Sequence, residues 1–309
     1  MGHNSIEVIM MRKRRRNIPD IAIAKNESEV LAINECLSLL DAENLINDRD
    51  VVVITPNWVQ QQMPETGIVV GPESLRGIIK FVKGRNPKRI IVATGSGQRP
   101  TSEIMEYSGS GKVIREEGVE FVDLNNGPFV RINLNHKRVP ATNLNKLFNE
   151  MTFLISFTQL KSHEEATMSA AIKNIALGWP PAEEHGYPKK NLGIHDDLHG
   201  FISAMAEEVK IDLSIVSASP AMIGTGPAKG VPRHTGIVIA GTDPVATDTV
   251  AARLLGFEPQ GVHYLFDCSN RGIGISDVTK MNIKGMTLLN AENDFSTAAY
   301  GSAVIVDGN

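Results

Sequence analysis

The chain has few cysteines and no long apolar run. Cys36 and Cys268 are its only cysteines in 309 residues, and neither belongs to a CxxC pair. A cysteine-ligated zinc or iron–sulfur centre therefore cannot be built within this chain, and a disulfide-dependent secreted fold is equally unexpected. No apolar stretch approaches the roughly 20 residues of a membrane span. We expect a cytoplasmic protein with no membrane segment and no iron–sulfur cluster.

An excess of positive charge is also missing. The net charge is −4, which favours neither nucleic acid nor an anionic membrane as a partner. The exception is a basic run from Arg12 to Arg16, which no signal-peptide-like apolar stretch follows. Because no aromatic residue interleaves these charges, nucleic-acid binding is not expected. We predict that residues 1–17 form a solvated, poorly ordered tail, with contact to an acidic partner as the alternative.

From residue 18 onward, apolar segments alternate with amphipathic ones. This alternation predicts βαβ units and an α/β fold of mostly parallel sheets with flanking helices. Strands are predicted at 20–24, 50–54, 89–93, 119–124, 152–157, 213–216 and 236–240. Helices are predicted after Ser28 and at 72–82, 101–107, 166–177, 195–209 and 244–255.

The length corresponds to about two domains. The polar stretch 135–140 is the best break, so we predict a first lobe over 18–135 and a second over 136–309, with a cleft between them. In open α/β sheets, ligands bind beyond the carboxyl ends of strands. The loops there carry Asn57, Gln98 with Arg99, the segment 158–167, and Asp243. Turn chemistry alone is the alternative for the short loops.

The third of these loops has the highest concentration of polar side chains. Lys161 and His163 precede the predicted helix 166–177, which carries Thr167, Lys173 and Asn174. Lysines near a helix N-terminus form an anion site, because the N–H groups and the helix dipole add to their charge. We predict catalytic roles for His163 and Lys173 and ligand contacts for the other three. A surface helix with solvated lysines is the alternative.

Two histidines suggest a metal site. His195 and His199 are spaced i, i+4 on a predicted helix, so they could bind a metal with a third ligand from elsewhere. The alternative is ordinary hydrogen bonding. Asp243 and Asp248 are predicted to shape the far wall of the ligand site.

Three motifs, in the same order as in a known family, carry a resemblance that covers roughly residues 18–282. The segments TQLKSHEEATMSAAIKN, DLSIVSASPAMIGTGP and IVIAGTDPVATDTVAARLLGF resemble the domain-of-unknown-function family 362. Many relatives in that family carry ferredoxin-like cysteine clusters, which this chain lacks.

A further resemblance is to the nickel-pincer lactate racemases. The segment 94–101 is similar to their Gly-x-His-Arg-Pro loop, and His163 precedes Lys173 by ten residues as in that family. The resemblance implies a lysine-attached nucleotide cofactor on Lys173 and acid/base chemistry at His163. The loop histidine is replaced by Gln98, which cannot exchange protons near neutral pH, so racemisation is not expected.

The sequence thus predicts a cleft for a small anionic ligand or a phosphate-bearing cofactor, in an enzyme acting on a small organic acid. A non-catalytic ligand-binding or electron-transfer accessory protein, paired with a separate iron–sulfur protein, is the alternative. The cofactor is not identified beyond a metal ion or a lysine-attached nucleotide, and a homo-oligomer is left open.

Overall fold

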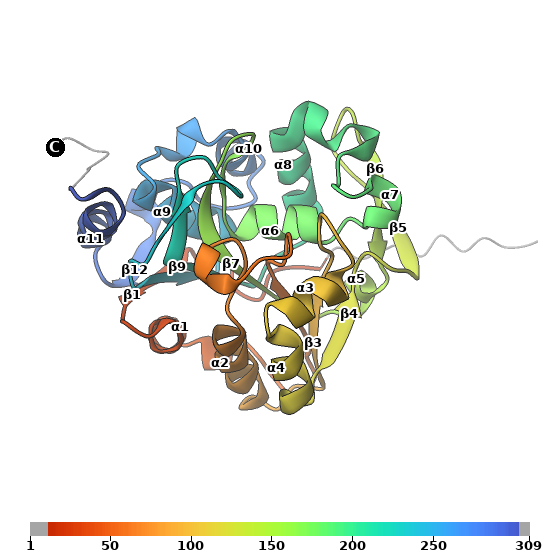
Figure 1. Ribbon diagram of the computed structural model, residues 1–309, viewed down its shortest axis with the longest axis horizontal. Coiled ribbons are helices and arrows are strands. Elements are labelled where there is room, and N and C mark those ends of the chain that lie inside the picture. Colours follow the sequence, from red (N-terminus) through yellow and green to blue (C-terminus); the bar gives the residue numbers. More distant parts are fainter. Residues whose placement is uncertain (1–11, 303–309) are drawn as a thin grey trace, which may run out of the picture.

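The computed structural model describes residues 12–302 and shows one large mixed sheet with helices on both faces (Figure 1). The sheet has the order β12-β1-β11-β9-β7-β2-β3-β4, with β10 paired to β9 and β8 to β7, and a separate hairpin joins β5 to β6. The strands are β1 Asp20–Lys25, β2 Val51–Pro56, β3 Arg89–Thr94, β4 Glu120–Asp123, β5 Phe129–Asn133, β6 Ala141–Asn145, β7 Phe153–His163, β8 Thr167–Ser169, β9 Leu213–Ile223, β10 Val231–Arg233, β11 Ile237–Gly241 and β12 Asn282–Gly285.

The centre of the sheet is parallel. β9, β7, β2, β3 and β4 run in the same direction, whereas β11 lies antiparallel to both β9 and β1. β2 is buried at all six positions, as its apolar, β-branched sequence predicts for a strand covered on both faces. The predicted α/β class with a mostly parallel sheet is therefore confirmed.

The helices form two layers, each with its own apolar core. They are α1 Glu29–Leu39, α2 Pro72–Lys83, α3 Thr101–Tyr107, α4 Ser110–Glu117, α5 Leu147–Glu150, α6 Ala171–Gly178, α7 Ala182–His185, α8 Leu198–Glu208, α9 Pro244–Leu254, α10 His263–Asn270 and α11 Leu288–Tyr300. Helices α1 to α4 cover one face and share one core, while α6, α8, α9, α10 and α11 pack into a second core on the other face. No helix in the described part of the chain is long and apolar enough to cross a membrane.

Strands from both sides of the predicted lobe boundary share the large sheet. β1, from the first segment, lies between β11 and β12, which come from the second. The division at 135–140 therefore does not coincide with a break in the sheet, and the two-lobe organisation stays a prediction.

Two predicted helices begin later than expected. The segment 166–177 was expected to be one helix, but β7 continues to His163 and turns back as β8, so α6 begins only at Ala171. The segment 195–209 divides at Asp197, whose side chain accepts a hydrogen bond from the Gly200 N–H and caps α8. A 3₁₀ stretch, Asn191–Asp197, precedes this cap.

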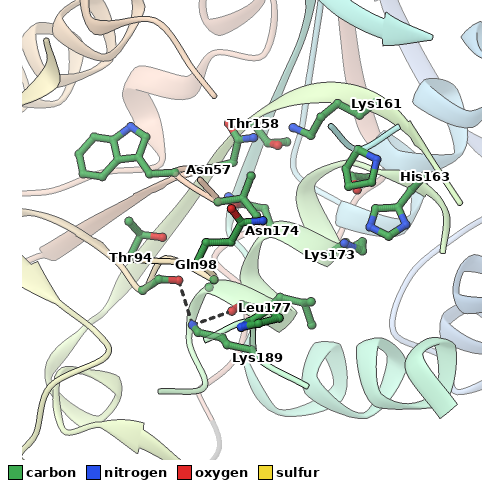
Figure 2. Close-up of a pocket in the computed structure, with 18 of the residues that line it drawn as sticks. Asn57, Thr94, Gln98, Thr158, Lys161, His163, Lys173, Asn174, Leu177 and Lys189 are labelled. Carbon is green, nitrogen blue, oxygen red and sulfur yellow. Dashed lines mark hydrogen bonds between the residues drawn. The ribbon is translucent and has the colours of Figure 1, made fainter. Parts of the chain in front are cut away.

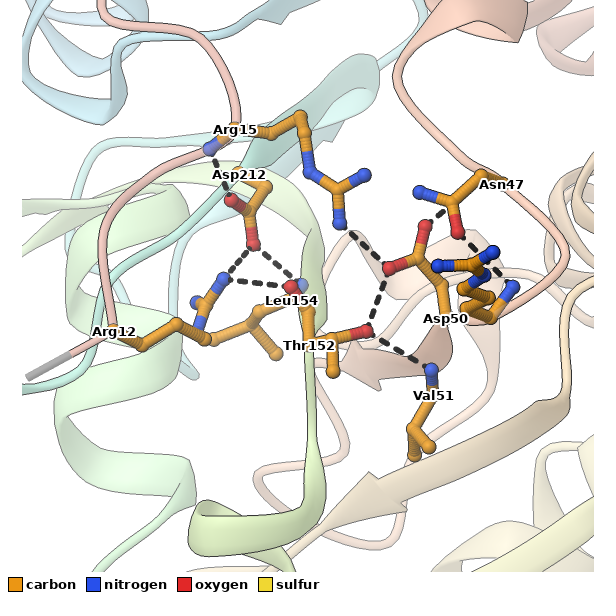
Figure 3. A network of polar contacts seen from close by, with 9 residues as sticks. Arg12, Arg15, Asn47, Asp50, Val51, Thr152, Leu154 and Asp212 are labelled. Carbon is orange, nitrogen blue, oxygen red and sulfur yellow. Dashed lines mark hydrogen bonds and ion pairs between the residues drawn. The ribbon is translucent and has the colours of Figure 1, made fainter. Parts of the chain in front are cut away.

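The basic run after residue 11 is not a free tail. Figure 3 shows Arg12 paired with Asp212 and Arg15 paired with Asp50. Arg16 pairs with Asp20 at 3.2 Å. These carboxylates lie beside the amino ends of β9, β2 and β1, so the arginines connect strands at the edge of the sheet away from the carboxyl ends of β2 and β3. The expectation of a solvated tail is wrong for residues 12–16, because buried carboxylates there require partners. Residues 1–11 lie outside the described part of the chain.

Candidate functional site

A cavity of about 160 Å³ lies beyond the carboxyl ends of β2 and β3 and along the second half of β7. Helix α6 forms its floor, and the segment 188–195 and Pro227 complete the wall. A cavity of similar volume, about 150 Å³, admits a benzene-sized molecule. The space therefore suits a small organic compound.

The charge of the cavity wall has one sign. Four lysines and two histidines line it: Lys161, Lys173, Lys189, Lys190, His163 and His195. No aspartate or glutamate is among the described residues that line it, although acidic residues outnumber basic ones in the whole chain by 35 to 31. Figure 2 shows Lys161, His163 and Lys173 on one side of the cavity and Lys189 below them.

Lys161 is buried on β7 with 3% of its surface exposed. Its ammonium donates to the Ile68 carbonyl at 3.2 Å and to the Gln159 carbonyl at 3.0 Å. Burial lowers the pKa of Lys161 to about 7, and the charge of Lys173 acts in the same direction. One of its three N–H donors remains for a ligand.

Lys173 lies on the first turn of α6 and is half-buried, whereas Lys161 and Lys189 are buried. It is the least constrained of these three lysines. Its Nζ makes no hydrogen bond or ion pair with the residues that the structure describes. Burial lowers its pKa to about 8, with the charge of Glu165 opposing the shift. All its donors and, in the neutral amine, its lone pair are available to a ligand.

Lys189 was not predicted from the sequence. Its ammonium donates to the Gly95 and Leu177 carbonyls, both at 2.9 Å, and burial lowers its pKa to about 7. Leu177 is near the C-terminus of α6, where the helix dipole favours a cation. The residue lies in an irregular segment after Pro188, so no periodic pattern in the sequence marked it.

The hydrogen bonds of His163 fix the protonation of its ring. Its Nδ1 accepts from the Glu165 and Ala166 N–H groups, at 3.1 and 3.2 Å. The hydrogen of the neutral ring is therefore on Nε2, which can donate to a ligand. Burial, followed by the charges of Lys173 and Lys161, lowers the pKa of His163 to about 2. The ring is thus a neutral donor.

The two histidines of the predicted metal pair do not share a helix face. His195 precedes the α8 cap, lines the cavity and pairs through Nδ1 with the Glu165 carboxylate. His199, inside α8, accepts a hydrogen bond from the Tyr264 N–H at 3.1 Å and lies against the His263 ring. His195 and His199 do not lie one turn apart on a single helix as the spacing predicted, because α8 begins only after its cap at Asp197.

Two asparagines form the middle of the cavity. Asn57 donates through Nδ2 to the Ile68 carbonyl at 2.8 Å, but its buried Oδ1 has no hydrogen-bond partner. Asn174 donates to the Thr55 carbonyl at 2.9 Å and to the Ser156 hydroxyl at 3.1 Å. A buried acceptor without a donor is costly, so the Asn57 oxygen indicates a ligand with an O–H or N–H group.

Four predicted ligand residues are not among those lining the cavity. Asp248 accepts from the Ala171 and Ile172 N–H groups at 2.8 and 3.0 Å, so it caps α6 in the place where we expected an anionic ligand. Asp243 caps α9 and pairs with Arg14.

The other two predicted ligand residues outside the cavity wall are Arg99 and Thr167. Arg99 is exposed and lies 3.7 Å from Glu103, and Thr167 has a positive φ of 65° in β8. Exposed Gln98 does line the cavity.

No group of three potential metal ligands (His, Cys, Asp or Glu) is found within residues 12–302. For Nε2 of His163 to bind a metal, its hydrogen would have to move to Nδ1. The two backbone hydrogen bonds that Nδ1 accepts would then be lost. Metal binding by His195 and His199 stays a prediction.

A known protein and a solved structure are similar to the chain. It is 25% identical over 224 residues to the thylakoid-associated protein sll1697 of Synechocystis, covering 70% of this chain and 66% of that protein. Among solved structures, the lactate racemase apoprotein from Thermoanaerobacterium thermosaccharolyticum is similar with a TM-score of 0.42 and 19% identity. That match covers 74% of this chain and 55% of the racemase chain, a likeness too low to transfer an activity.

A family model matches the central part of the chain. It is described as "Domain of unknown function (DUF362)" and matches residues 52–253, well over half of the chain. The matched region contains every residue that lines the cavity, from Asn57 to Pro227. The chain belongs to the DUF362 family.

Proposed function

We propose that the cavity binds a small organic acid, and that the protein is an enzyme acting on it. The observation that carries this proposal is the composition of the cavity wall, which has four lysines and no carboxylate among its described residues. Burying ammonium groups together is unfavourable unless an anion compensates them. The N–H groups of Lys161, Lys173 and Lys189 that make no hydrogen bond within the protein would bind the carboxylate of this acid.

Other cavity residues indicate which functional groups the acid carries besides its carboxylate. The unpaired Asn57 oxygen favours a hydroxyl or amino group on the acid, and the His163 Nε2–H can donate to a carbonyl or hydroxyl oxygen. The Glu165–His195 pair supports an enzyme over a passive binder. A carboxylate on Nδ1 leaves Nε2 of His195 as an acceptor, the arrangement of an oriented general base.

The test is ligand binding measured by calorimetry, comparing lactate and pyruvate with their neutral amides. We expect the acids to bind and the amides not to bind. Lys173→Met should weaken acid binding by about 10-fold or more, because it removes a charge-assisted contact worth about 1.5–3 kcal/mol. It breaks no hydrogen bond within the described part of the chain, so the fold should persist.

Lys112→Met is the matched control, since Lys112 is a surface lysine with a 75% exposed side chain. Equal binding of acids and amides, or equal loss in the two variants, would contradict the proposal. A cytoplasmic location is also proposed, supported by the two free, buried cysteines. Recovery of the protein with membranes on cell fractionation would argue against that location.

A further inference from the structure

Lys161, Lys173 and Lys189 all line the cavity but differ in what their nitrogen atoms contact. The Nζ atoms of Lys161 and Lys189 each donate to two backbone carbonyls, which hold these nitrogens as donors. The Lys173 Nζ has no such partner among the described residues, and it lies in the same cavity. Lys173 is therefore the one lysine of the three whose nitrogen can approach a ligand without giving up a hydrogen bond.

A proton carrier lies in the same cavity. Glu165 pairs with His195 Nδ1 and also acts electrostatically on Lys173. The His195 Nε2 can thus accept a proton close to the amine and return it. His163 presents an Nε2–H, which suits a carbonyl oxygen.

We propose that the Lys173 amine condenses with the carbonyl carbon of a small oxo acid to form an imine, with His195 carrying the proton. This inference rests on the proposed acid-binding site. The carboxylate of the oxo acid takes the spare N–H donor of Lys161, and its carbonyl oxygen accepts from His163.

The chemistry balances without an oxidant or reductant. The amine lone pair forms a C–N bond, the C=O π bond breaks, and the first amine proton passes through His195 to the former carbonyl oxygen, which gives a carbinolamine. The second amine proton then passes through His195 to the hydroxyl group, the C–O bond breaks, and one water leaves. Burial helps this reaction, because a lysine pKa near 8 keeps a substantial fraction of Lys173 as the neutral amine at neutral pH.

The experiment traps the imine in the full-length protein. The intact mass is measured first, to establish that Lys173 carries no attached group. Pyruvate is then added with borohydride, which supplies hydride to reduce an imine to a stable secondary amine. We expect one reduced pyruvate per chain, located on Lys173 by peptide mapping and absent from Lys173→Met. Lys112→Met should be modified like the wild type.

His195→Asn tests the proton carrier. General acid–base catalysis typically contributes 10²- to 10⁴-fold, so trapping should slow by about 10²-fold. An unchanged trapping rate would remove His195 from the proposal.

Calorimetry without borohydride separates the two proposals. Pyruvate binding without trapping would overturn the imine and leave the acid site standing, whereas no binding would overturn both. Modification mainly at Lys161, Lys189 or surface lysines would overturn the assignment to Lys173. A group already attached to Lys173 in the purified protein would do so as well.

Discussion

At the residue scale, the site depends on how closely the backbone packs around the lysines. Gly226 lies against Ser162, which stands between Lys161 and His163 on β7. A Cβ at Gly226 would lie 1.9 Å from the Ser162 carbonyl oxygen, which is backbone and cannot swing aside. The Gly226 carbonyl also accepts a hydrogen bond from the Glu164 N–H. The glycine therefore fixes the end of β7 and both functional side chains on it.

Gly226→Ala should displace this end of β7. We expect acid binding to weaken by about 10-fold or more, and the free energy of unfolding to fall by about 1–3 kcal/mol, the usual cost of overpacking. Calorimetry and urea denaturation measure the two effects. Gly261→Ala is the control, because a Cβ there meets nothing within 4 Å. Unchanged acid affinity in Gly226→Ala would show that this packing does not position the lysines.

At the element scale, the sequence predicted the central strands well and the edges of the site poorly. Strands β2 and β3 have apolar, β-branched sequences, and the polar residues after them mark the carboxyl edge of the sheet. The start of α6 could not be read from the sequence. The segment 166–177 has helix-compatible residues throughout, and only the pairing of β8 with β7 converts its beginning into a strand.

The later start of α6 explains why its N-terminus is not open to an anion as the sequence predicted, although Lys161 and Lys173 do line the cavity. Helix N-termini attract anions in general, but here the long-range contact with Asp248 already satisfies the first N–H groups. No local pattern reveals a contact across 77 residues. Lys189 could not be predicted for the same reason, because it reaches the cavity from an irregular segment and its position depends on long-range contacts.

At the scale of the whole molecule, the arginines after residue 11 join strands that are distant in the sequence. Arg15 donates to Asp50 at 2.6 Å before β2, and its backbone N–H donates to Asp212 before β9. Thr152, before β7, donates to the same Asp50 oxygen at 2.7 Å. Although burial acts to raise it, the hydrogen bonds from Arg15, Asn47 and Thr152 lower the pKa of Asp50 below its ordinary value.

Arg15→Met should lower the free energy of unfolding by about 1–3 kcal/mol, because it leaves the Asp50 carboxylate without its charged partner. The exposed pair Arg115–Glu106 gives the control, and Arg115→Met should cost much less, because solvent screens an exposed ion pair. Because the pKa of Asp50 is lower in the folded protein, this stabilisation is present at neutral pH and is lost as pH falls through the folded-state pKa. Denaturant titrations at neutral and acidic pH measure it. A pH-independent difference would contradict the ion-pair explanation.

The central claim is that the lysine ammonium groups of the cavity bind the carboxylate of a small acid, and proton uptake tests it most directly. Free Lys161, Lys173 and Lys189 have pKa values of about 7, 8 and 7, so they are largely neutral at pH 8.5. A bound carboxylate stabilises the ammonium form and raises these pKa values, so binding takes up protons and weakens as pH rises further.

Calorimetric titration with lactate, which cannot form an imine, in two buffers of different ionisation enthalpy at pH 8.5 counts the protons exchanged. We predict net uptake in the wild type, less uptake in Lys173→Met, and affinity that falls between about pH 7 and 10. Lactate binding with no proton uptake, and with an affinity independent of pH across that range, would contradict the account.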